Sequence, residues 1–343
     1  MSYIYVVVVL FFHKNANDGA RNGIVSNVTL KKLSEQTGYS IRSVNRALKG
    51  QPGIGQETRE RILEAARKAG YTPNIAARNL RKKQNNFVGI IVPNNTLEVF
   101  ARKRLMLQCE FEMAGFYPVI GLFGKDAKHL KKTLCDWAGL VETVVIMQWS
   151  EELDPERLLK GLPFRFIFID CSVYGNKFTN ISVDRSSGIR SGVETLIAGG
   201  RRRIARCGHM RSSRSGFDHA FTGAIPADCQ KLFIPSGGLE FADGYAAGKI
   251  LLKEQVDAVF FDTDRLALGF YKYAAENHIA IPDQIAVIGF DDDTAGQYAV
   301  PSLSTVAHPM EAISRETVKI ASSSSNEVTQ LILKTEFIRR DSI

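Results

Sequence analysis

Residues 28–50 read VTLKKLSEQTGYSIRSVNRALKG, and this stretch decides the fold of the N-terminal part of the chain. Its first leucines have the spacing of one helical face, and Gly38 ends that predicted helix. Ser40 can cap a second helix over residues 41–48, and a third helix is predicted over residues 56–69. Two short helices joined by a tight glycine turn, with a third helix packed behind them, form a helix-turn-helix.

The predicted second helix carries side chains that suit contact with DNA bases. Arg42 and Arg46 are four residues apart and therefore project from one face of the helix. A guanidinium group can bond both acceptors on the major-groove edge of guanine. An ordinary solvent-facing surface is the alternative. Short polar side chains nearby suit the phosphate oxygens of DNA: Thr29, Ser40, Ser43 and Asn45.

The positive charge of the chain is concentrated in the same region. The whole chain has a formal net charge of +8, and residues 28–87 hold 13 Lys and Arg against four Glu. The residues after position 87 hold 29 basic and 31 acidic side chains, which leaves them close to neutral. A basic block in front of a neutral body is typical of a nucleic-acid-binding protein, and a merely solvated basic face is the alternative.

Residues 71–83, YTPNIAARNLRKK, follow the third predicted helix. Pro73 and Asn74 mark a helix start, but the helix is shorter than the roughly 12–15 residues that an isolated helix needs in water. We therefore expect this segment to order on DNA, with basic side chains on phosphate and Leu80 as an apolar wedge in the minor groove. The same residues are equally compatible with a basic linker.

Residues 1–27 lack this patterning. Residues 3–12, YIYVVVVLFF, are apolar, but this run is only about half of a membrane span. No basic residue precedes it and no cleavage pattern follows it, so it is a poor signal peptide. Our hypothesis is that residues 1–27 are disordered or non-native, through a start codon assigned upstream of the true one. A short added strand or a membrane-peripheral tail is the alternative.

Short apolar strands alternate with helical stretches from Phe87 onward, which indicates parallel sheets covered by helices on both faces. The predicted strands are residues 88–92, 118–122, 144–147, 166–170, 181–183, 204–207, 258–261 and 285–290. Ligands bind at the carboxyl ends of the strands in such sheets. The polar residues just past those ends are Asn94, Asn95, Asp170, Asp184, Arg190, Asp262 and Asp264.

At this point a resemblance to a known family can be stated. Residues 28–50, together with TRERILEAARKAGYTPNIAARNLR at residues 58–81, resemble the N-terminal module of the LacI/GalR family of bacterial transcriptional regulators. The similarity continues to the C-terminus through VFFDTDRLALGF, IPDQIAVIGFDDD and PSLSTVAHP. The chain departs from the family pattern at Tyr39, Lys32, Asn45 and Lys49, which leaves the DNA sequence it reads open.

The resemblance implies an all-α helix-turn-helix DNA-binding domain joined to a two-lobed α/β domain of the periplasmic-binding-protein type, with doubly wound parallel sheets. It implies a DNA-binding domain at residues 28–73, a hinge helix or linker at 74–86 and an effector-binding and dimerisation core at 87–343. The N-subdomain of the core is expected at about 87–171 and 292–322, and the C-subdomain at about 172–291 and 323–343.

The resemblance also assigns roles to single residues. The base-reading residues would be Ile41, Arg42 and Arg46. The residues on the DNA backbone would be Thr29, Ser40, Ser43, Asn45, Thr58 and Asn74, and Ala77 and Leu80 would enter the minor groove at the hinge. The effector would contact Asn94, Asp184, Arg190 and Asp264.

Several of these assignments have simpler alternatives. Asp264 could equally be the N-cap of the helix that follows it, and Arg190 a surface arginine. The aromatic ring that sugar-binding members stack on their ligand is absent before Gly244, unless Phe241 supplies it.

An enzyme is not expected. Asp262, Asp264 and residues 291–293 are carboxylate clusters that could hold Mg²⁺, but no catalytic or metal-binding motif accompanies them. The five cysteines are odd in number and widely spaced, which argues against a disulfide scaffold and a zinc site. We expect no catalytic residues, no metal and no cofactor.

The sequence therefore predicts a cytoplasmic, dimeric transcription factor, most simply a repressor, that binds a palindromic operator and responds to a sugar-like effector without contacting a membrane. A solute-binding protein of the periplasmic type and an effector-independent DNA-binding regulator are the alternatives.

Overall fold

The computed structural model describes residues 28–71, 86–94, 97–123, 126–150, 152–171, 177–209 and 216–343. The chain divides into two compact units, Met1–Lys82 and Lys83–Ile343, and each is described by itself. The expectations for residues 1–27 and for Asn74, Ala77, Leu80 and Asn95 lie outside the described residues. Among the residues that are described, no helix has the length and apolar character needed to cross a membrane.

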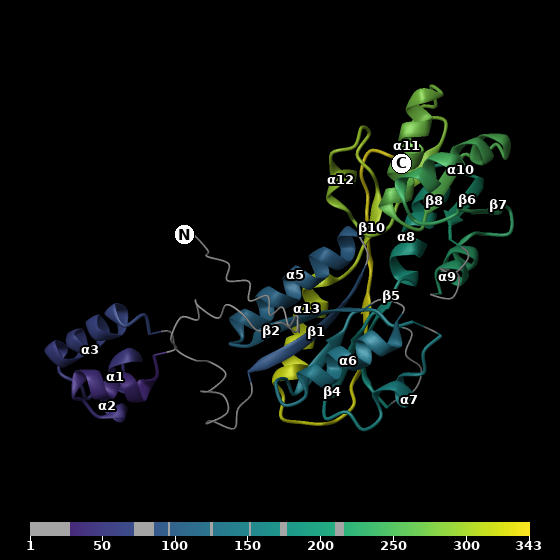
Figure 1. Ribbon diagram of the computed structural model, residues 1–343. Coiled ribbons are helices and arrows are strands. Elements are labelled where there is room, and N and C mark those ends of the chain that lie inside the picture. Colours follow the sequence, from purple (N-terminus) through teal and green to yellow (C-terminus); the bar gives the residue numbers. More distant parts are fainter. Residues whose placement is uncertain are drawn as a thin grey trace, which may run out of the picture. The chain divides into compact units, whose positions relative to one another are not determined.

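The described residues of the first unit form three helices around a small apolar core (Figure 1). They are α1 (Leu30–Thr37), α2 (Ile41–Leu48) and α3 (Gln56–Lys68), close to the predicted ranges. Gly38 follows α1 with a φ of 74°, a left-handed conformation that favours glycine. The side chain of Ser40 accepts a hydrogen bond of 3.1 Å from the backbone N–H of Ser43 and so caps α2. The buried side chains are Val28, Leu33, Val44, Ala47, Ile62 and Ala66.

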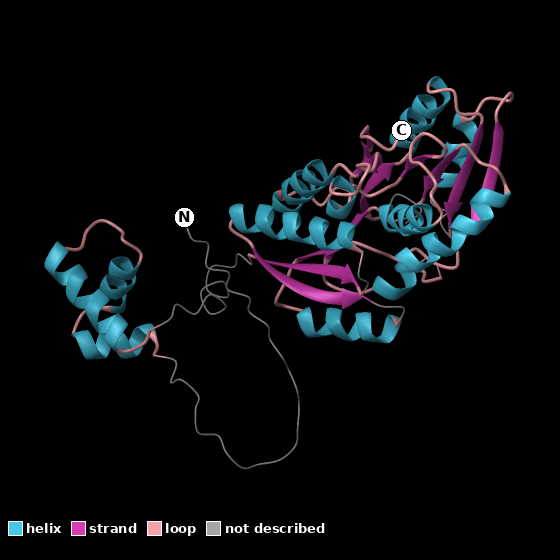
Figure 2. Cartoon of the chain, turned by 90° about the horizontal axis from the view of Figure 1, so that it is seen from above, coloured by secondary structure: helices cyan, strands magenta, loops and turns pink. Residues whose placement is uncertain are grey.

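The first lobe of the second unit is a parallel six-stranded sheet with the order β11-β5-β4-β3-β1-β2. Its strands are β1 (Phe87–Pro93), β2 (Tyr117–Phe123), β3 (Thr143–Ile146), β4 (Arg165–Ile169), β5 (Thr179–Asp184) and β11 (Gln330–Lys334). Helices cover both faces (Figure 2). One apolar cluster packs against α5 (Glu98–Met113) and α13 (Met310–Ser322), and the other against α6 (Ala127–Trp137) and α7 (Pro155–Leu159).

The second lobe has a parallel four-stranded sheet with the order β7-β6-β8-β9. Its strands are β6 (Arg203–Gly208), β7 (Gln230–Pro235), β8 (Ala258–Phe261) and β9 (Ala286–Ile288). Helices α8 (Ser186–Ala198) and α9 (Phe217–Ala224) pack on one apolar cluster, and α10 (Phe241–Lys253) and α11 (Asp264–Glu276) pack on another. The short helix α12 (Thr294–Gln297) and an antiparallel pair of β10 (Thr305–Ala307) and β12 (Glu336–Ile338) complete it.

The chain passes between the lobes at Arg185, at residues 308–309 and at Thr335, and two of these crossings are bonded to each other. The backbone N–H of Thr335 donates to the carbonyl of Asp184 over 3.0 Å, and the hydroxyl of Thr335 accepts from the N–H of Gly188 over 3.1 Å. These bonds tie the first and third crossings together as one joint.

The expected lobe boundaries need correction. Strands β5 and β11 belong to the sheet of the first lobe, so residues 179–184 and 330–334 do not lie in the C-subdomain as expected. Leu303 and Val306 pack in the apolar clusters of the second lobe, so the segment after residue 292 reaches the first lobe only with α13. An apolar run predicts a strand but does not reveal which of two parallel sheets it joins, and this caused the difference.

Gly244 of α10 allows the close approach of α10 and α11. A Cβ atom on Gly244 would lie 1.9 Å from the carbonyl oxygen of Leu266, whereas Gly223 on α9 has open space around it. We expect Gly244→Ala to lower the free energy of unfolding by about 1–3 kcal/mol, because backbone rather than a flexible side chain must move. Gly223→Ala is the control and should be neutral or slightly stabilising. Equal effects in chemical denaturation would contradict this account of the helix pair.

Candidate functional site

Helix α2 presents a cationic surface without acidic neighbours. Ile41 and Arg42 are exposed and Arg46 is partly exposed. Neither arginine is within ion-pairing distance of a carboxylate among the described residues. Three of the four glutamates in the described part of this unit pair with lysine or arginine of their own helices: Glu35 with Lys31, Glu57 with Arg61 and Glu64 with Lys68. The fourth, Glu60, accepts a hydrogen bond of 3.2 Å from Gln56 Nε2 on the same helix. The positive charge of α2 is therefore available to an external anion.

Short hydroxyl side chains flank this surface and are already oriented by the backbone. Thr29 caps α1 by accepting from the N–H of Lys32 over 3.2 Å. The hydroxyls of Ser40 and Ser43 lie 2.9 Å apart. A hydroxyl that accepts a backbone hydrogen bond keeps its own hydrogen to donate, so capping leaves Thr29 and one of the two serines a hydrogen for phosphate, while the other serine donates within the Ser40–Ser43 pair. Asn45 and Thr58 are partly exposed on α2 and α3.

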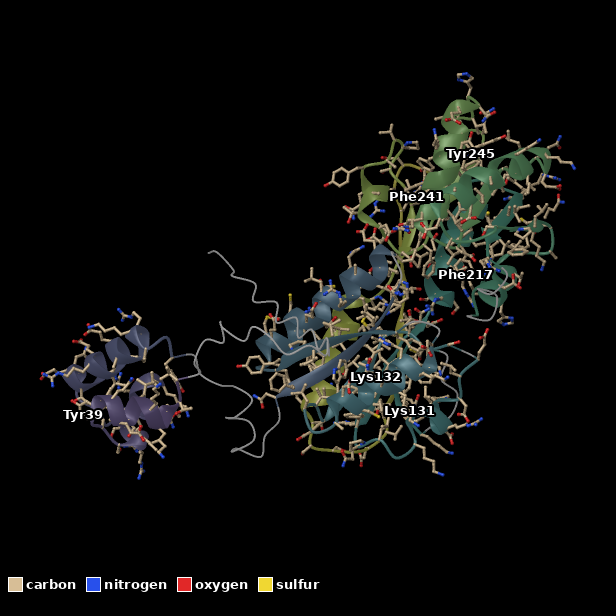
Figure 3. All side chains as sticks on the ribbon, viewed as in Figure 1. Tyr39, Lys131, Lys132, Phe217, Phe241 and Tyr245 are labelled. Atoms are coloured by element: carbon tan, nitrogen blue, oxygen red, sulfur yellow. The ribbon has the colours of Figure 1, made fainter. Side chains whose placement is uncertain are left out.

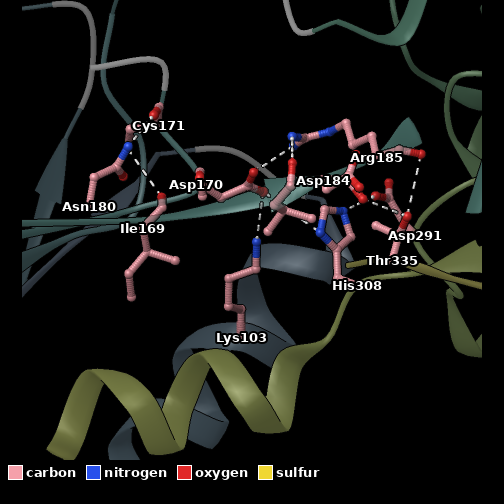
Figure 4. Close-up of polar contacts among 12 residues, drawn as sticks. Lys103, Ile169, Asp170, Cys171, Asn180, Asp184, Arg185, Asp291, His308 and Thr335 are labelled. Atoms are coloured by element: carbon pink, nitrogen blue, oxygen red, sulfur yellow. Dashed lines mark hydrogen bonds and ion pairs between the residues drawn. The ribbon is translucent and has the colours of Figure 1, made fainter. Parts of the chain in front are cut away.

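In the second unit, charged side chains from several elements meet at Asp170 (Figure 4). Asp170 follows β4 with a φ of 52°, and its carboxylate is bonded by Lys103 Nζ at 3.2 Å and Arg185 Nη2 at 2.8 Å. His308 Nδ1 lies 3.7 Å from the same carboxylate, and His308 Nε2 lies 3.2 Å from Asp291 Oδ1. These five residues, the inter-lobe cluster, come from α5, the end of β4, two crossings and the loop after β9.

Burial and charge set the protonation of the inter-lobe cluster. Burial opposes ionisation of Asp170, but Arg185 and Lys103 outweigh it and hold the pKa of Asp170 well below its usual range. Burial raises the pKa of Asp291, which favours its neutral acid. Burial and the nearby Lys103 lower the pKa of His308, which favours the neutral imidazole. The cluster therefore holds two cations and one ionised carboxylate.

A pocket of about 410 Å³ opens beside the inter-lobe cluster. Asp291 and His308 belong to both the cluster and the pocket wall. Arg102 of α5 also lines the pocket. The volume falls in the range of about 300–1,000 Å³ that is usual for small-ligand sites. The remaining lining residues are Met106, Asp292, Ala307, Pro309, Met310, Glu311, Ala312 and Arg315.

The four predicted effector residues lie elsewhere. Asn94 is exposed after β1, and Arg190 is exposed on α8 with no ion pair among the described residues. Asp184 binds the N–H and the hydroxyl of Ser186, at 2.9 and 2.5 Å, at the start of α8. None of the four lines the pocket.

Asp264 is fully buried and has a structural role. It accepts hydrogen bonds from the hydroxyl of Thr305 at 2.6 Å and from the N–H of Asp293 at 2.7 Å. The side chain that caps α11 is that of the preceding residue, Thr263, so Asp264 is not the cap either. Its carboxylate instead joins α11 to the segment that leads back toward the first lobe.

Asp262 and Phe241 also have partners within the chain. Arg206, buried in β6, bonds both oxygens of Asp262 at 2.8 Å and lies between the rings of Phe217 and Phe233. Phe241 is 45% exposed on α10, with the guanidinium of Arg265 over its ring at 5.3 Å (Figure 3). An arginine already covers this ring, and neither residue lines the pocket.

Most members of the inter-lobe cluster were not among the predicted site residues. Asp170 was predicted from its place after β4, but Lys103, Arg185, Asp291 and His308 were not assigned. The sequence did indicate that Lys103 is buried. It lies at four-residue spacing with Val99, Leu107 and Phe111, which form the buried face of α5. A lysine on the inward face of a helix must find a buried anion.

Comparison with known proteins finds transcriptional regulators among the relatives of this chain. It is 28% identical over 297 residues to the HTH-type transcriptional regulator GntR of Pseudomonas aeruginosa, covering 84% of this chain and 86% of the relative. A family model described as a periplasmic binding protein-like domain matches residues 193–343. The resemblance to the LacI/GalR family of transcriptional regulators is confirmed.

Solved structures show the same fold. The Lac repressor dimer bound to operator and the anti-inducer ONPF superposes with a TM-score of 0.76 at 20% identity, covering 92% of this chain and 99% of that one. A complex of the transcriptional regulator CelR with cellobiose gives a TM-score of 0.64 at 23% identity, with 92% of this chain and 99% of that one covered. The second unit thus has the periplasmic-binding-protein-like architecture with parallel sheets that was expected.

The carboxyl group of Asp293 makes the stability of the protein depend on pH, and this can be tested. Asp293 Oδ1 is buried and has no hydrogen-bond partner among the described residues, and burial together with Glu98 raises the pKa of Asp293 to about 6. A carboxyl whose pKa is higher in the folded than in the unfolded protein stabilises the fold in acid. It loses that contribution as the pH rises from about 4 through 6.

We therefore expect Asp293→Asn to be more stable than the parent by roughly 1–3 kcal/mol above about pH 7, and to lose this advantage below about pH 4. Thermal unfolding at the two pH values measures the difference. Asp228→Asn, at an exposed position, is the control and should change neither value. A destabilised Asp293→Asn protein at neutral pH would contradict the raised pKa.

Proposed function

We propose that this chain is a sequence-specific DNA-binding transcriptional regulator, acting as a repressor, whose operator binding is modulated by a small polar, sugar-like effector. The observation that carries the proposal is the surface of α2. There Arg42 is exposed, Arg46 is partly exposed, and neither has a carboxylate partner among the described residues. The curated relative is a transcriptional regulator, and the superposed repressor is bound to operator DNA.

In this proposal α1, α2 and α3 form a helix-turn-helix whose second helix lies in the major groove. Ile41, Arg42 and Arg46 contact base edges. Thr29, Ser40, Ser43, Asn45 and Thr58 bond the DNA backbone and fix the register of the helix, because phosphate contacts position a protein without reading sequence. Asn74, Ala77 and Leu80 act at the hinge, where the backbone and the minor groove are contacted.

We propose that the protein acts as a homodimer on a palindromic operator, since a two-fold protein matches a two-fold site. Exposed apolar side chains of the second unit support an interface: Tyr298 and Val300 are 81% and 93% exposed. Large exposed apolar groups in a soluble protein mark contact surfaces when they gather together. We place the protein in the cytoplasm, where it meets its operator.

The effector would act on the lobe crossings. The inter-lobe cluster includes Arg185 and His308, which stand in two of the three crossings, and the pocket touches the second of these. A ligand in the pocket therefore changes contacts that hold the lobes at one angle. Because coupling between two binding sites is reciprocal, an effector that weakens operator binding is itself bound less well by the DNA-bound protein.

The proposal assigns no catalytic step. The carboxylates that suggested a Mg²⁺ site have partners within the protein: Asp262 bonds Arg206, Asp264 bonds Thr305, and Asp292 bonds Arg340 at 2.6 Å. A solute-binding protein of the periplasmic type shares the two lobes, and the three-helix unit with its cationic α2 favours the regulator over it.

Base reading by α2 can be tested at Arg46. We expect Arg46→Ala to cost roughly 1–3 kcal/mol of binding to an operator selected from random duplex, with little loss on unrelated DNA. Arg61→Ala is the matched control, because Arg61 lies on α3 in an ion pair with Glu57 and should change neither affinity. Fluorescence anisotropy at constant salt measures both, and equal losses on all sequences would refute base reading.

The dimer can be tested at the exposed apolar surface. We expect Tyr298→Asp combined with Val300→Asp to raise the dimer dissociation constant, because each change places a charge in an apolar interface. Sedimentation equilibrium measures the constant. Ile332→Asp, at an exposed position of the edge strand β11, is the control and should leave it unchanged. A double variant that stays fully dimeric would remove this surface from the interface.

A further inference from the structure

The pocket beside the inter-lobe cluster lies in an environment with surplus positive charge. Within the cluster, Lys103 and Arg185 share the single carboxylate of Asp170. Lys103 is 1% exposed and the side chain of Asp170 is 7% exposed, so solvent screens this group poorly. A buried lysine and an arginine whose side chain is 22% exposed share this one buried anion, which leaves about one positive charge without a counter-charge, since Asp291 favours its neutral acid.

A third cation faces the same centre. Arg102 lines the pocket, and its Nη1 donates to the backbone carbonyl of Asp292, which carries no formal charge. Among the described residues it is within ion-pairing distance of no carboxylate. The carboxylate of Asp292 bonds Arg340, and Glu311 at the pocket rim bonds Arg315 at 3.0 Å. The acidic side chains of the pocket wall are therefore not paired with Arg102, whose charge also acts on Asp293 outside the wall.

The protonation of His308 depends on the charged groups around it. Lys103, Arg185 and Arg102 all oppose its protonation, and only Asp170 favours it among the leading influences. Its Nδ1 atom is buried and has no hydrogen-bond partner among the described residues. An imidazole on the pocket wall, surrounded by three cations and one ionised carboxylate, lies where an incoming anion would be stabilised.

From this geometry we infer that the effector is a polyol that carries an anionic group, and that the anionic group binds against Arg102 and His308. Lys103 and Arg185 support it from behind, through the field of the inter-lobe cluster. The hydroxyl groups of such a ligand find donors and acceptors in Asp291 and Asp292. This inference rests on the proposed function, because it names the ligand class of the same effector site.

An anionic ligand also suits the mechanical role of the crossings. Arg185 and His308 stand in two crossings, and each contacts a carboxyl of the inter-lobe cluster. His308 lines the pocket and Arg185 does not, so an anion in the pocket competes with Asp291 for His308 and acts on Arg185 through its charge. The ligand therefore exchanges a bond that holds the lobes together for a bond to itself, which a neutral sugar does less effectively because charge-assisted bonds are stronger.

The experiment is a calorimetric titration of the full chain with matched ligands that differ in charge. The anionic probes are gluconate, glucuronate and glucose 6-phosphate, and the neutral probe is glucose. We expect at least one anionic probe to bind roughly tenfold or more tightly than glucose. Comparing the affinities of the two carboxylate probes with that of the phosphate ester shows which anionic group the site prefers. Glucose binding as tightly as every anionic probe, or no binding of any anionic probe, would overturn the inference.

Variants separate a ligand site from a purely structural ion pair. We expect Arg102→Gln and Lys103→Met each to weaken the best anionic probe by roughly tenfold and to change glucose binding by less than about twofold. Lys131→Met is the matched control, because Lys131 is exposed on α6 away from the cluster (Figure 3). If Arg102→Gln keeps full anion affinity while remaining folded by circular dichroism, the inference fails.

Failure of this inference and failure of the proposed function give different results. Operator binding in the absence of ligand is measured on the same preparations. A protein that selects an operator but binds anionic and neutral probes alike contradicts only the ligand class. A protein that binds the anionic probes but shows no preference for any duplex contradicts the regulator and leaves the anion site standing.

Discussion

The two lobes depend on one buried ion, the carboxylate of Asp170. It lies at the end of a central strand with a left-handed backbone, and it is bonded by Lys103 from α5 and Arg185 from the first crossing, with His308 of the second crossing nearby. Removing one partner from a buried pair leaves an uncompensated charge, which is far more costly than losing a surface salt bridge. The angle between the lobes is therefore tied to the protonation and the partners of a single group.

Under the proposed function, the same constraint gives a small ligand a means of controlling the surface of a separate unit. The second unit contains two apolar cores in each lobe, and such cores resist gradual deformation. Motion is left to the crossings, which is where the inter-lobe cluster lies. The cationic surface of α2 belongs to a separate unit with its own small core. This separation agrees with the proposed division into a DNA-reading unit and an effector-sensing unit.

The sequence predicted the helices and strands better than it predicted which side chains contact one another. The helices of the first unit were predicted closely because Gly38 and Ser40 are strong local signals, and the eight predicted strands are present. Strands β7, β10, β11 and β12 were missed, because β10 and β12 have only three residues each and β7 and β11 are largely exposed. Asp264 illustrates the limit at the site. A carboxylate after a strand looks the same in sequence whether it faces a ligand or, as here, bonds Thr305 in the interior.

The most direct test of the account is the affinity of one anionic probe for the free protein and for the protein bound to its selected operator. If the inter-lobe cluster links the two sites, the probe affinity must differ between the two forms. The factor must equal the one by which saturating probe changes operator affinity. Agreement of these two factors, measured by calorimetry and by anisotropy, is the predicted result. Equal probe affinity in both forms would show that ligand binding and DNA binding are independent.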